Sequence, residues 1–304
     1  MTAVELSSVS RWYGNVVAVN DVTLTVGPGL TGLLGPNGAG KTTVLHLMAG
    51  LLAPSQGSVL VGGDPAWRNP AMYKTLGLVT ERESVPGFLT ARQFVLASAR
   101  LHRLAAPEAA ARRALETVEM TDAQDRRIST YSKGMRQRTR VAAALVHDPG
   151  VLLLDEPFNG MDPRQRLHMM ELLHRMAEQE GRTILFSSHI LEEVEQLSGT
   201  VQVIVAGRLA ASGDYRRIRR LMTNRPHVFT IASSDDRRLA TVLMGHESVT
   251  GVRVEDGTLQ VHANDYGTFT RALAKQAKAS DIRLTSVLPA DESLEKVFSY
   301  LVAT

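Results

Sequence analysis

The chain has 304 residues, enough for one large domain and a smaller one, or for two domains of medium size. Hydrophobic residues make up 44% of it and charged residues 21%, as in ordinary globular proteins, and the formal net charge of +3 is too small to indicate binding to nucleic acid or anionic lipid. Cysteine is absent, which excludes disulfides and thiolate metal sites and agrees with a reducing compartment.

The first part of the chain is predicted to form β-strands that lead into a glycine-rich loop. Residues 4–14 and 19–27 alternate between apolar and polar side chains and stop at glycine or proline. The apolar run at 30–35 predicts a further strand, and a helix is expected over 41–51. The loop between them has the sequence GPNGAGKTT and spans residues 35–43.

This loop fits the pattern G-x-x-x-x-G-K-[ST] of phosphate-binding loops and lies between a strand and a helix, as that pattern requires. Its glycines let successive backbone N–H groups turn inward toward phosphate oxygens, and the next helix adds its positive N-terminal end. Lys41 can reach the β- and γ-phosphates, and the hydroxyl of Thr42 can ligate Mg²⁺. A glycine-rich turn that contains lysine by chance is the weaker alternative, so the loop predicts a nucleoside-triphosphate site.

The middle of the chain changes from strands to helices. Residues 89–119 are rich in Ala, Leu and Arg at helical spacing and predict a helical insert, which we place at about 85–135. Another helix is expected to begin at Ser132, which can serve as its N-cap. The run VLLLDEP at 151–157 is apolar and continuous, as in a strand buried within a parallel sheet.

Asp155 and Glu156 end this buried strand, at the sheet edge where the phosphate loop is also expected. Asp155 would hold Mg²⁺ through water, and Glu156 would polarise the attacking water as a general base. An acidic pair that faces solvent is the alternative, and the phosphate loop upstream makes it the weaker one.

A further helix and strand follow. Asp162 and the proline after it form a cap and a first helical position, and Gly181 closes the helix that they begin. Its histidines, His168 and His174, stand among methionines and could suggest a metal site, but Met and Leu at helical spacing favour a core-facing helix. The run TILFSSH at 183–189 is the next buried strand. This alternation predicts an α/β parallel sheet with its ligand at the carboxyl ends of the strands.

The last part of the chain has a pattern of its own. A basic stretch at 214–220 is interpreted as a connector with a solvated helix face. Beyond Pro226 we expect the order strand, helix, strand, strand, helix, strand, helix, which suggests a small ferredoxin-like βαββαβ unit. We therefore divide the chain into a nucleotide-binding domain at 1–215 and a small α+β domain at 216–304.

Five motifs occur in an order typical of one family. They are GPNGAGKTT (35–43), YSKGMRQR (131–138), VLLLDEP (151–157), NGMDP (159–163) and FSSH (186–189). Because of these motifs, residues 3–215 resemble the nucleotide-binding subunit of ABC transporters. The tail at 293–301 resembles the ends of members of the exporter branch, which is grouped with multidrug, antibiotic and lipid export. The resemblance implies a P-loop NTPase ABC cassette: a RecA-like parallel core with an antiparallel β subdomain and a helical subdomain.

The resemblance also implies roles for single residues. The loop residues that would surround the ATP phosphates are Asn37, Gly38, Gly40, Lys41, Thr42 and Thr43. Tyr13 matches the aromatic residue that stacks on adenine, although a tyrosine near a strand end can also serve packing alone. Ser132 and Gly134 match the signature loop, which in this family completes the ATP site of the opposite subunit. Lys133 and Tyr131 replace the usual glycine and leucine of that loop.

Two further matches lie near the γ-phosphate. Asp162 matches the loop that bridges the two nucleotide sites, and it can also be the N-cap of its helix. His189 matches the switch histidine that contacts the γ-phosphate. Its distance past Glu156 favours this role over a purely structural one.

One position departs from the family pattern. Glu81 aligns with a glutamine that touches Mg²⁺ and the attacking water and links the site to the membrane subunit. A carboxylate can still bind Mg²⁺ as a hard oxygen ligand, but it adds negative charge beside the γ-phosphate, so turnover or its coupling can change. If the alignment shifts by two residues, Glu83 takes this place; we assign it to Glu81.

By resemblance, the chain is expected to be an ATPase subunit that binds ATP and Mg²⁺ at a dimer interface. One chain carries one set of motifs, so a second cassette, identical or different, must complete two sites. A separate membrane permease would carry the substrate, with export favoured. No run approaches the ~20 apolar residues of a membrane span and the first residues lack a secretory signal, so we expect a place on the cytoplasmic face of the membrane, held by the permease.

A non-transport ABC ATPase acting on nucleic acid or ribosomes is the alternative. Chromosome-acting members carry very long coiled-coil insertions, excision-repair members carry cysteine-bound zinc, and ribosome-acting members usually have two cassettes. This sequence has none of these features, so transport is favoured and no nucleic-acid partner is expected. The domain after Pro226 could regulate the ATPase or extend the dimer contact, because its fold alone indicates no ligand.

Overall fold

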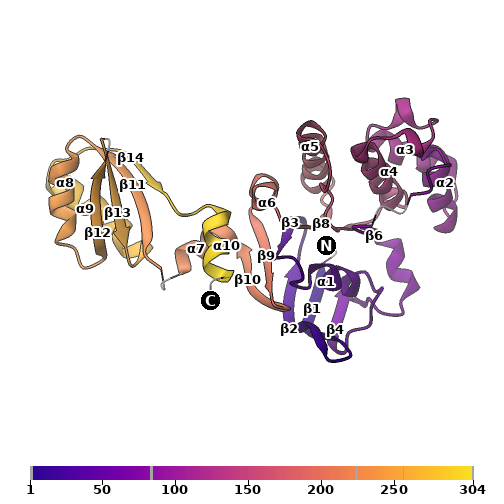
Figure 1. Cartoon of the computed structure of the whole chain (residues 1–304), viewed down its shortest axis with the longest axis horizontal. Coiled ribbons are helices and arrows are strands. Elements are labelled where there is room, and N and C mark those ends of the chain that lie inside the picture. The colour runs from indigo at the N-terminus through magenta and orange to yellow at the C-terminus, as the bar shows by residue number, and fades with distance from the viewer. Residues whose placement is uncertain (1–2, 83–84, 223–224, 256, 303–304) are drawn as a thin grey trace. The chain divides into compact units, whose positions relative to one another are not determined.

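The computed structural model describes residues 3–82, 85–222, 225–255 and 257–302 (Figure 1). The chain divides into two compact units, Met1–Ser212 and Gly213–Thr304, and each is described by itself. Among the helices of the described residues, none is long and apolar enough to cross a membrane.

The first unit contains a four-stranded antiparallel sheet. Its strands are β1 (Val4–Tyr13), β2 (Val16–Val26), β4 (Gln56–Val61) and the short β5 (Asp64–Pro65), in the order β2-β1-β4-β5. Alternation along β1 buries Val4 and Leu6, and a register shift between Leu6 and Val9 buries Val9 in the same core, together with Val44 and Leu45. The two strands predicted at the start of the chain are therefore confirmed.

A six-stranded sheet forms the centre of the first unit. Its strands, in spatial order, are β10 (Arg208–Asp214), β9 (Thr200–Val205), β3 (Gly29–Leu34), β8 (Thr183–Ser188), β7 (Val151–Leu154) and β6 (Leu76–Val79). Strand β3 pairs in parallel with β8 and β9, and β7 pairs in parallel with β6 and β8. Every residue of β7 and β8 is buried, as their continuous apolar runs predicted. The carboxyl ends of β3, β6, β7 and β8 consequently lie at one edge of the sheet.

The helices of the first unit follow the predicted order. They are α1 (Lys41–Met48), α2 (Ala91–Leu101), α3 (Pro107–Thr117), α4 (Lys133–Leu145), α5 (Pro163–Gln179) and α6 (Leu191–Leu197), with 3₁₀ turns at Pro70–Lys74, Thr121–Ala123 and Ile128–Thr130. Helices α2, α3 and α4 pack on one another and form a helical part beside the sheets (Figure 1). Helix α1 ends earlier than the predicted residue 51, because the chain turns at Gly50, whose φ is 65°.

Helix α5 begins and packs as its sequence predicts. The Oδ1 atom of Asp162 accepts a hydrogen bond of 2.9 Å from the backbone N–H of Gln165, which is an N-cap contact. Met169 and Met176 are fully buried. The methionines of α5 therefore belong to the core, as their spacing predicted.

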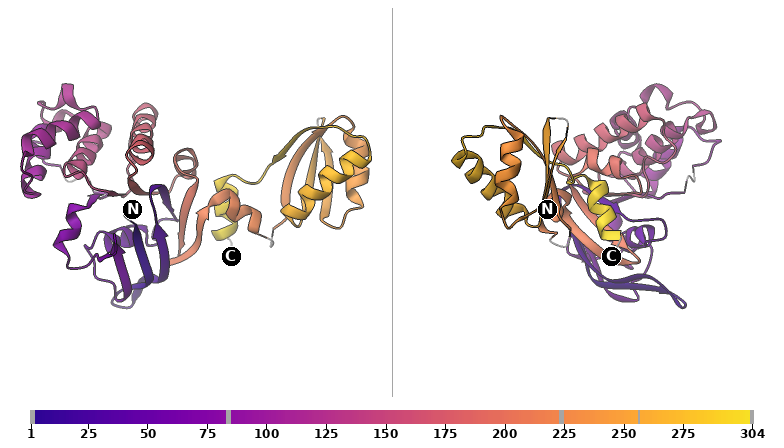
Figure 2. Two further views of the ribbon diagram at one scale, coloured as in Figure 1. Left: turned by 180° about the vertical axis from the view of Figure 1, so that it is seen from behind. Right: turned by 60° about the vertical axis from the view of Figure 1, so that its left-hand side comes forward.

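The second unit is an α+β sandwich. Its elements are α7 (Tyr215–Leu221), β11 (His227–Ser233), α8 (Asp236–Met244), β12 (Val249–Glu255), β13 (Thr258–Ala263), α9 (Tyr266–Ala279), β14 (Leu284–Pro289) and α10 (Leu294–Val302). The strand order β12-β13-β11-β14, with antiparallel neighbours, is that of a ferredoxin-like βαββαβ unit. Helices α8 and α9 cover one face of this sheet (Figure 2), and Phe229, Leu239 and Phe269 are fully buried beneath them.

The prediction of a solvated basic face on α7 is wrong for Arg219. Its side chain is fully buried and paired with Asp291, which is 4% exposed. The guanidinium also donates a 2.8 Å hydrogen bond to the carbonyl oxygen of Pro226 and lies 5.1 Å from the ring centroid of Tyr300. A buried cation requires such partners, and residues distant in sequence supply them here.

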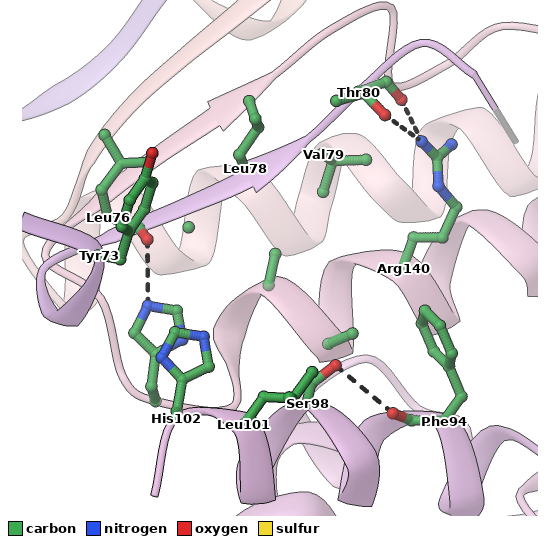
Figure 3. A pocket seen from close by; sticks show the side chains of 14 residues that line it. Tyr73, Leu76, Leu78, Val79, Thr80, Phe94, Ser98, Leu101, His102 and Arg140 are labelled. Atoms are coloured by element: carbon green, nitrogen blue, oxygen red, sulfur yellow. Dashed lines mark hydrogen bonds between the residues drawn. The ribbon is translucent and has the colours of Figure 1, made fainter. Parts of the chain in front are cut away.

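Two stacked histidines lie between the helical part and β6 (Figure 3). The rings of His102 and His147 are 3.8 Å apart and nearly parallel, at 9°. The Nε2 atom of His147 lies 3.1 Å from the carbonyl oxygen of Leu76 and can donate to it. Burial, and then the neighbouring His102, lower the pKa of His147 from 6.5 to about 4.

The first unit is therefore expected to lose stability as the pH falls from about 6.5 toward about 4. Over this window the unfolded chain protonates His147 while the folded chain keeps it neutral, so the unfolded state binds more protons. The variant His147→Gln keeps a donor for Leu76 but cannot titrate. Its melting temperature should fall less between pH 7 and pH 5 than that of the wild-type chain. If the melting temperatures of the two chains, measured by circular dichroism, fall by the same amount between pH 7 and pH 5, this role of His147 is wrong.

Candidate functional site

The site begins at the carboxyl end of β3, where the chain passes through the glycine loop into α1. Gly38 and Gly40 have φ angles of 78° and 107°, in a region that L side chains rarely adopt. A Cβ atom on Gly40 would also lie 2.5 Å from the carbonyl oxygen of Ala18. The loop therefore requires glycine here for conformation and for space.

The ammonium group of Lys41 lies inside this loop. Its Nζ donates hydrogen bonds to the carbonyl oxygens of Gly35, at 2.8 Å, and Pro36, at 3.4 Å. Burial lowers the pKa of Lys41, while the nearby carboxylates of Glu156 and Asp155 oppose that shift. A phosphate oxygen that reaches the loop would therefore meet a donor that is already held in position.

A cavity of about 400 Å³ lies beside the loop and brings most of the predicted residues together. It is lined by Ala18, Asn37, Gly38, Gly40, Lys41, Thr42, Thr43, Glu81 and Glu156. All of them except Ala18 were candidate site residues in the sequence. Ala18 was missed because its methyl side chain, on an N-terminal strand, gives no chemical signal.

Asp155 follows β7 and is 2% exposed. Its Oδ1 accepts a 2.7 Å hydrogen bond from the hydroxyl of Ser187, whereas its Oδ2 has no hydrogen-bond partner among the described residues. An unpartnered, buried carboxylate oxygen is costly, and a divalent cation or a water bound to one would satisfy it. The carboxylate of Asp155 and the hydroxyl of Thr42 are hard oxygen donors, so the residues present suit Mg²⁺.

Glu156 and His189 form a pair at the carboxyl ends of β7 and β8. The Nδ1 atom of His189 lies 2.9 Å from Oε2 of Glu156. Burial raises the pKa of Glu156, and the hydrogen bond with His189 partly opposes the increase. Glu156 also has a positive φ of 49°, an uncommon backbone conformation for a residue other than glycine. A carboxylate held in this way is suited to accept a proton from water.

Ser187 joins these two carboxylate residues and was missed in the sequence. Its hydroxyl donates to Asp155 and accepts a 2.8 Å hydrogen bond from the backbone N–H of Glu156. The available signal was its place two residues before His189, on the strand beside β7. A serine in a fully buried strand needs a polar partner, and Asp155 is the nearest one.

The signature-loop residues lie outside this cavity. Ser132 caps α4, and its hydroxyl accepts hydrogen bonds of 3.2 Å from the backbone N–H of Met135 and from Nε2 of Gln165. A Cβ atom on Gly134 would lie 2.0 Å from Oε1 of Gln165, so a side chain there would require the side chain of Gln165 to move. Asp162 also lies outside the cavity, at the start of α5.

Tyr13 is not among the residues that line the cavity either. It lies at the end of β1 with 43% of its surface exposed, and the guanidinium of Arg11 lies 4.9 Å from its ring centroid. Its stacking on adenine stays a prediction. Glu81, by contrast, lines the cavity together with Lys41 and Glu156. The alternative residue Glu83 lies outside the described part of the chain.

Comparison with known proteins gives consistent matches. The sequence model of a family described as ABC transporter matches residues 19–159. The bacitracin transport ATP-binding protein BcrA of Enterococcus faecalis is 32% identical, over 98% of this chain and 96% of its own length. The linearmycin resistance ATP-binding protein LnrL of Bacillus subtilis is 29% identical, over 97% of this chain and 96% of its own length. Both relatives therefore extend through the second unit.

Solved structures share the fold. An ATP-binding subunit of an ABC transporter superposes with a TM-score of 0.64 and 27% sequence identity, and the match covers 71% of this chain and 92% of that one. A dimeric ATP-binding cassette bound to ADP and Pi gives a TM-score of 0.63 at 21% identity, with 69% of this chain and 98% of that one covered. The cassette fold expected from the motifs is thereby confirmed.

Replacing Glu156 with glutamine is expected to lower ATP hydrolysis about 10²–10⁴-fold and to leave ATP binding intact, because the amide cannot take the proton from water. Lys41→Ala is the matched variant and should instead weaken ATP binding itself, because a phosphate donor is lost. Phosphate release and isothermal titration calorimetry measure the two effects. Hydrolysis near the wild-type rate in Glu156→Gln would contradict the role of Glu156 as general base. Unchanged ATP affinity in Lys41→Ala would contradict the role of Lys41 in phosphate binding.

Proposed function

This chain belongs to the ATP-binding subunits of exporter-type ABC transporters, and we propose that it holds ATP and Mg²⁺ jointly with a second cassette. One observation carries the proposal. The cavity of a single chain contains the phosphate loop and Glu156, but Ser132 and Gly134 lie outside it. A signature loop from a second chain would complete the site with a hydroxyl and the N-terminal end of α4.

The polar residues at the phosphate loop and at the end of β7 have proposed parts in binding ATP and Mg²⁺. Lys41 would exchange the carbonyl oxygens of Gly35 and Pro36 for phosphate oxygens, with the backbone N–H groups of the loop around them. Thr42, Asp155 and Glu81 would hold Mg²⁺, which neutralises charge on the β- and γ-phosphate oxygens when it is bound. The unpartnered Oδ2 of Asp155 supports this assignment.

Proton transfer is assigned to Glu156. One carboxylate oxygen would accept a proton from the attacking water, while Oε2 stays with Nδ1 of His189. Ser187 would keep Glu156 and Asp155 at a fixed separation, because it bonds to both. His189 is 45% exposed at its side chain and would reach the γ-phosphate from this position.

The transport partner is proposed to be a separate membrane permease. A relative that matches along nearly the whole chain is named a transport ATP-binding protein, so we expect the transported compound to cross through another protein, which would also hold this chain at the cytoplasmic face. Two relatives that match along nearly the whole chain are named for bacitracin transport and linearmycin resistance. We infer that the cargo is a compound of that kind.

The joint site predicts a nucleotide-dependent dimer. The Glu156→Gln chain with ATP and Mg²⁺ should sediment as a dimer, because bound ATP is not consumed and contacts both chains. Lys41→Ala under the same conditions should remain monomeric. Analytical ultracentrifugation with and without ATP measures this. If Glu156→Gln with ATP stays strictly monomeric, alone and together with its co-purified partners, the proposed joint site is wrong.

The inferred cargo can be tested in the native cell. Removal of this chain should increase susceptibility to bacitracin or linearmycin, and the wild-type chain should restore resistance because ATP hydrolysis drives export. Growth inhibition assays over a concentration series give the measurement. Glu156→Gln should not restore resistance although it still binds ATP. Unchanged susceptibility to both compounds would contradict the inferred cargo. The ATPase function would not be affected by that result, because the hydrolysis assay tests it separately.

A further inference from the structure

Arg140 is a nearly buried arginine on α4 that reaches away from its own helix. The residue is 9% exposed, and its side chain extends to the segment that follows β6, residues 80–82 (Figure 3). One guanidinium nitrogen, Nη2, donates hydrogen bonds to the backbone carbonyl of Thr80 and, at 2.9 Å, to that of Arg82. It also lies 3.5 Å from the hydroxyl of Thr80. Arg140 therefore bonds to the backbone on both sides of Glu81.

The other end of the guanidinium is fixed to α4 itself. Its Nη1 donates a 2.6 Å hydrogen bond to Oε1 of Gln137, one helical turn earlier, and Gln137 is 8% exposed. A planar guanidinium with bonds in two directions is a rigid connection, because it has little freedom to rotate. The 80–82 segment follows the end of β6, so these bonds help to set the path of its backbone.

Arg140 lies between two hollows of the first unit. On one side, a cavity of about 350 Å³ is lined by Glu81, Lys133, Glu156 and Asn159 as well as Arg140. On the other side, Arg140 borders a cavity of about 380 Å³ between β6, α2 and α4, where Phe94 and Leu78 are neighbours (Figure 3). The N-cap of the same helix, Ser132, lies about 12 Å along the helix axis from Arg140, at 1.5 Å per residue.

We propose that Arg140 is a positioning residue for ATP hydrolysis. Its hydrogen bonds fix the position of the Glu81 carboxylate relative to α4. A movement of α4 relative to the sheet must then move Glu81 or break the bonds of Arg140. The signature loop at the start of α4 and the Glu81 carboxylate at the phosphate cavity are thereby linked within one chain. This inference rests on the proposed place of Glu81 in the ATP site, and Arg140 itself touches no reacting atom.

The test compares Arg140→Met and Arg140→Lys with the wild-type full-length chain. Methionine keeps much of the apolar stem and removes the donors, so kcat for ATP hydrolysis should fall about 10- to 100-fold, with KM for ATP within about twofold. Lysine restores one charged donor but not the fork, so its kcat should lie between the other two. Arg113→Ala, at an exposed arginine of α3, is the matched control and should leave kcat unchanged.

Two readouts distinguish positioning of Glu81 from a general structural role. In a Glu81→Ala background, Arg140→Met should lower kcat by less than about twofold further, because the group that it positions is gone. Amide hydrogen exchange over the 80–82 segment should also be faster in Arg140→Met than in the wild-type chain, at an unchanged melting temperature. Exchange does not depend on turnover.

Three results would overturn the inference. They are an unchanged kcat in Arg140→Met, a full additional loss of kcat in the Glu81→Ala background, and an unchanged exchange rate over residues 80–82. A wild-type chain that fails to hydrolyse ATP would count against the function in the previous section instead. The exchange measurement would still decide whether Arg140 holds the segment.

Discussion

The candidate site depends on one constraint of parallel sheets, namely that neighbouring strands end at the same edge. Strand β3 delivers the phosphate loop there, β7 delivers Asp155 and Glu156, and β8 delivers His189. The hydroxyl of Ser187, on β8, then bonds to both residues that follow β7. Because β7 and β8 are buried along their whole lengths, the packed core of the unit holds this edge in place.

Charge is distributed at this edge in a way that suits a highly charged ligand. The ammonium of Lys41 is buried among carbonyl oxygens, and three carboxylates act on its pKa, with Glu81 among them. The loop offers donors to phosphate, while Asp155 offers an unpartnered oxygen. The phosphates of ATP would bring negative charge to the donors of the loop, and the cation proposed above would bring positive charge to Oδ2 of Asp155.

The sequence predicted much of the fold because its signals are local. The loop at 35–43 is contiguous, and its glycines indicate a backbone conformation that other residues rarely adopt. The apolar runs on either side predict the strand before the loop and the helix after it. The order of elements beyond Pro226 is equally local, and the observed strand order is the ferredoxin-like one expected from it. The ends of helices were less predictable. Helix α1 ends before the turn at Gly50, and the spacing of apolar residues does not indicate that end.

What the sequence by itself determined, then, is the set of elements and the presence of a phosphate loop followed by a strand-end pair of carboxylates. Only the tertiary structure decided which side chains meet. Asp155 bonds to Ser187 across 32 positions of sequence, and Arg140 bonds to Thr80 across 60. The tertiary structure also buries Arg219, which the sequence had predicted to be solvated. Local periodicity and motifs act over a few residues, whereas the partners of a buried polar group are set by the packing of distant elements.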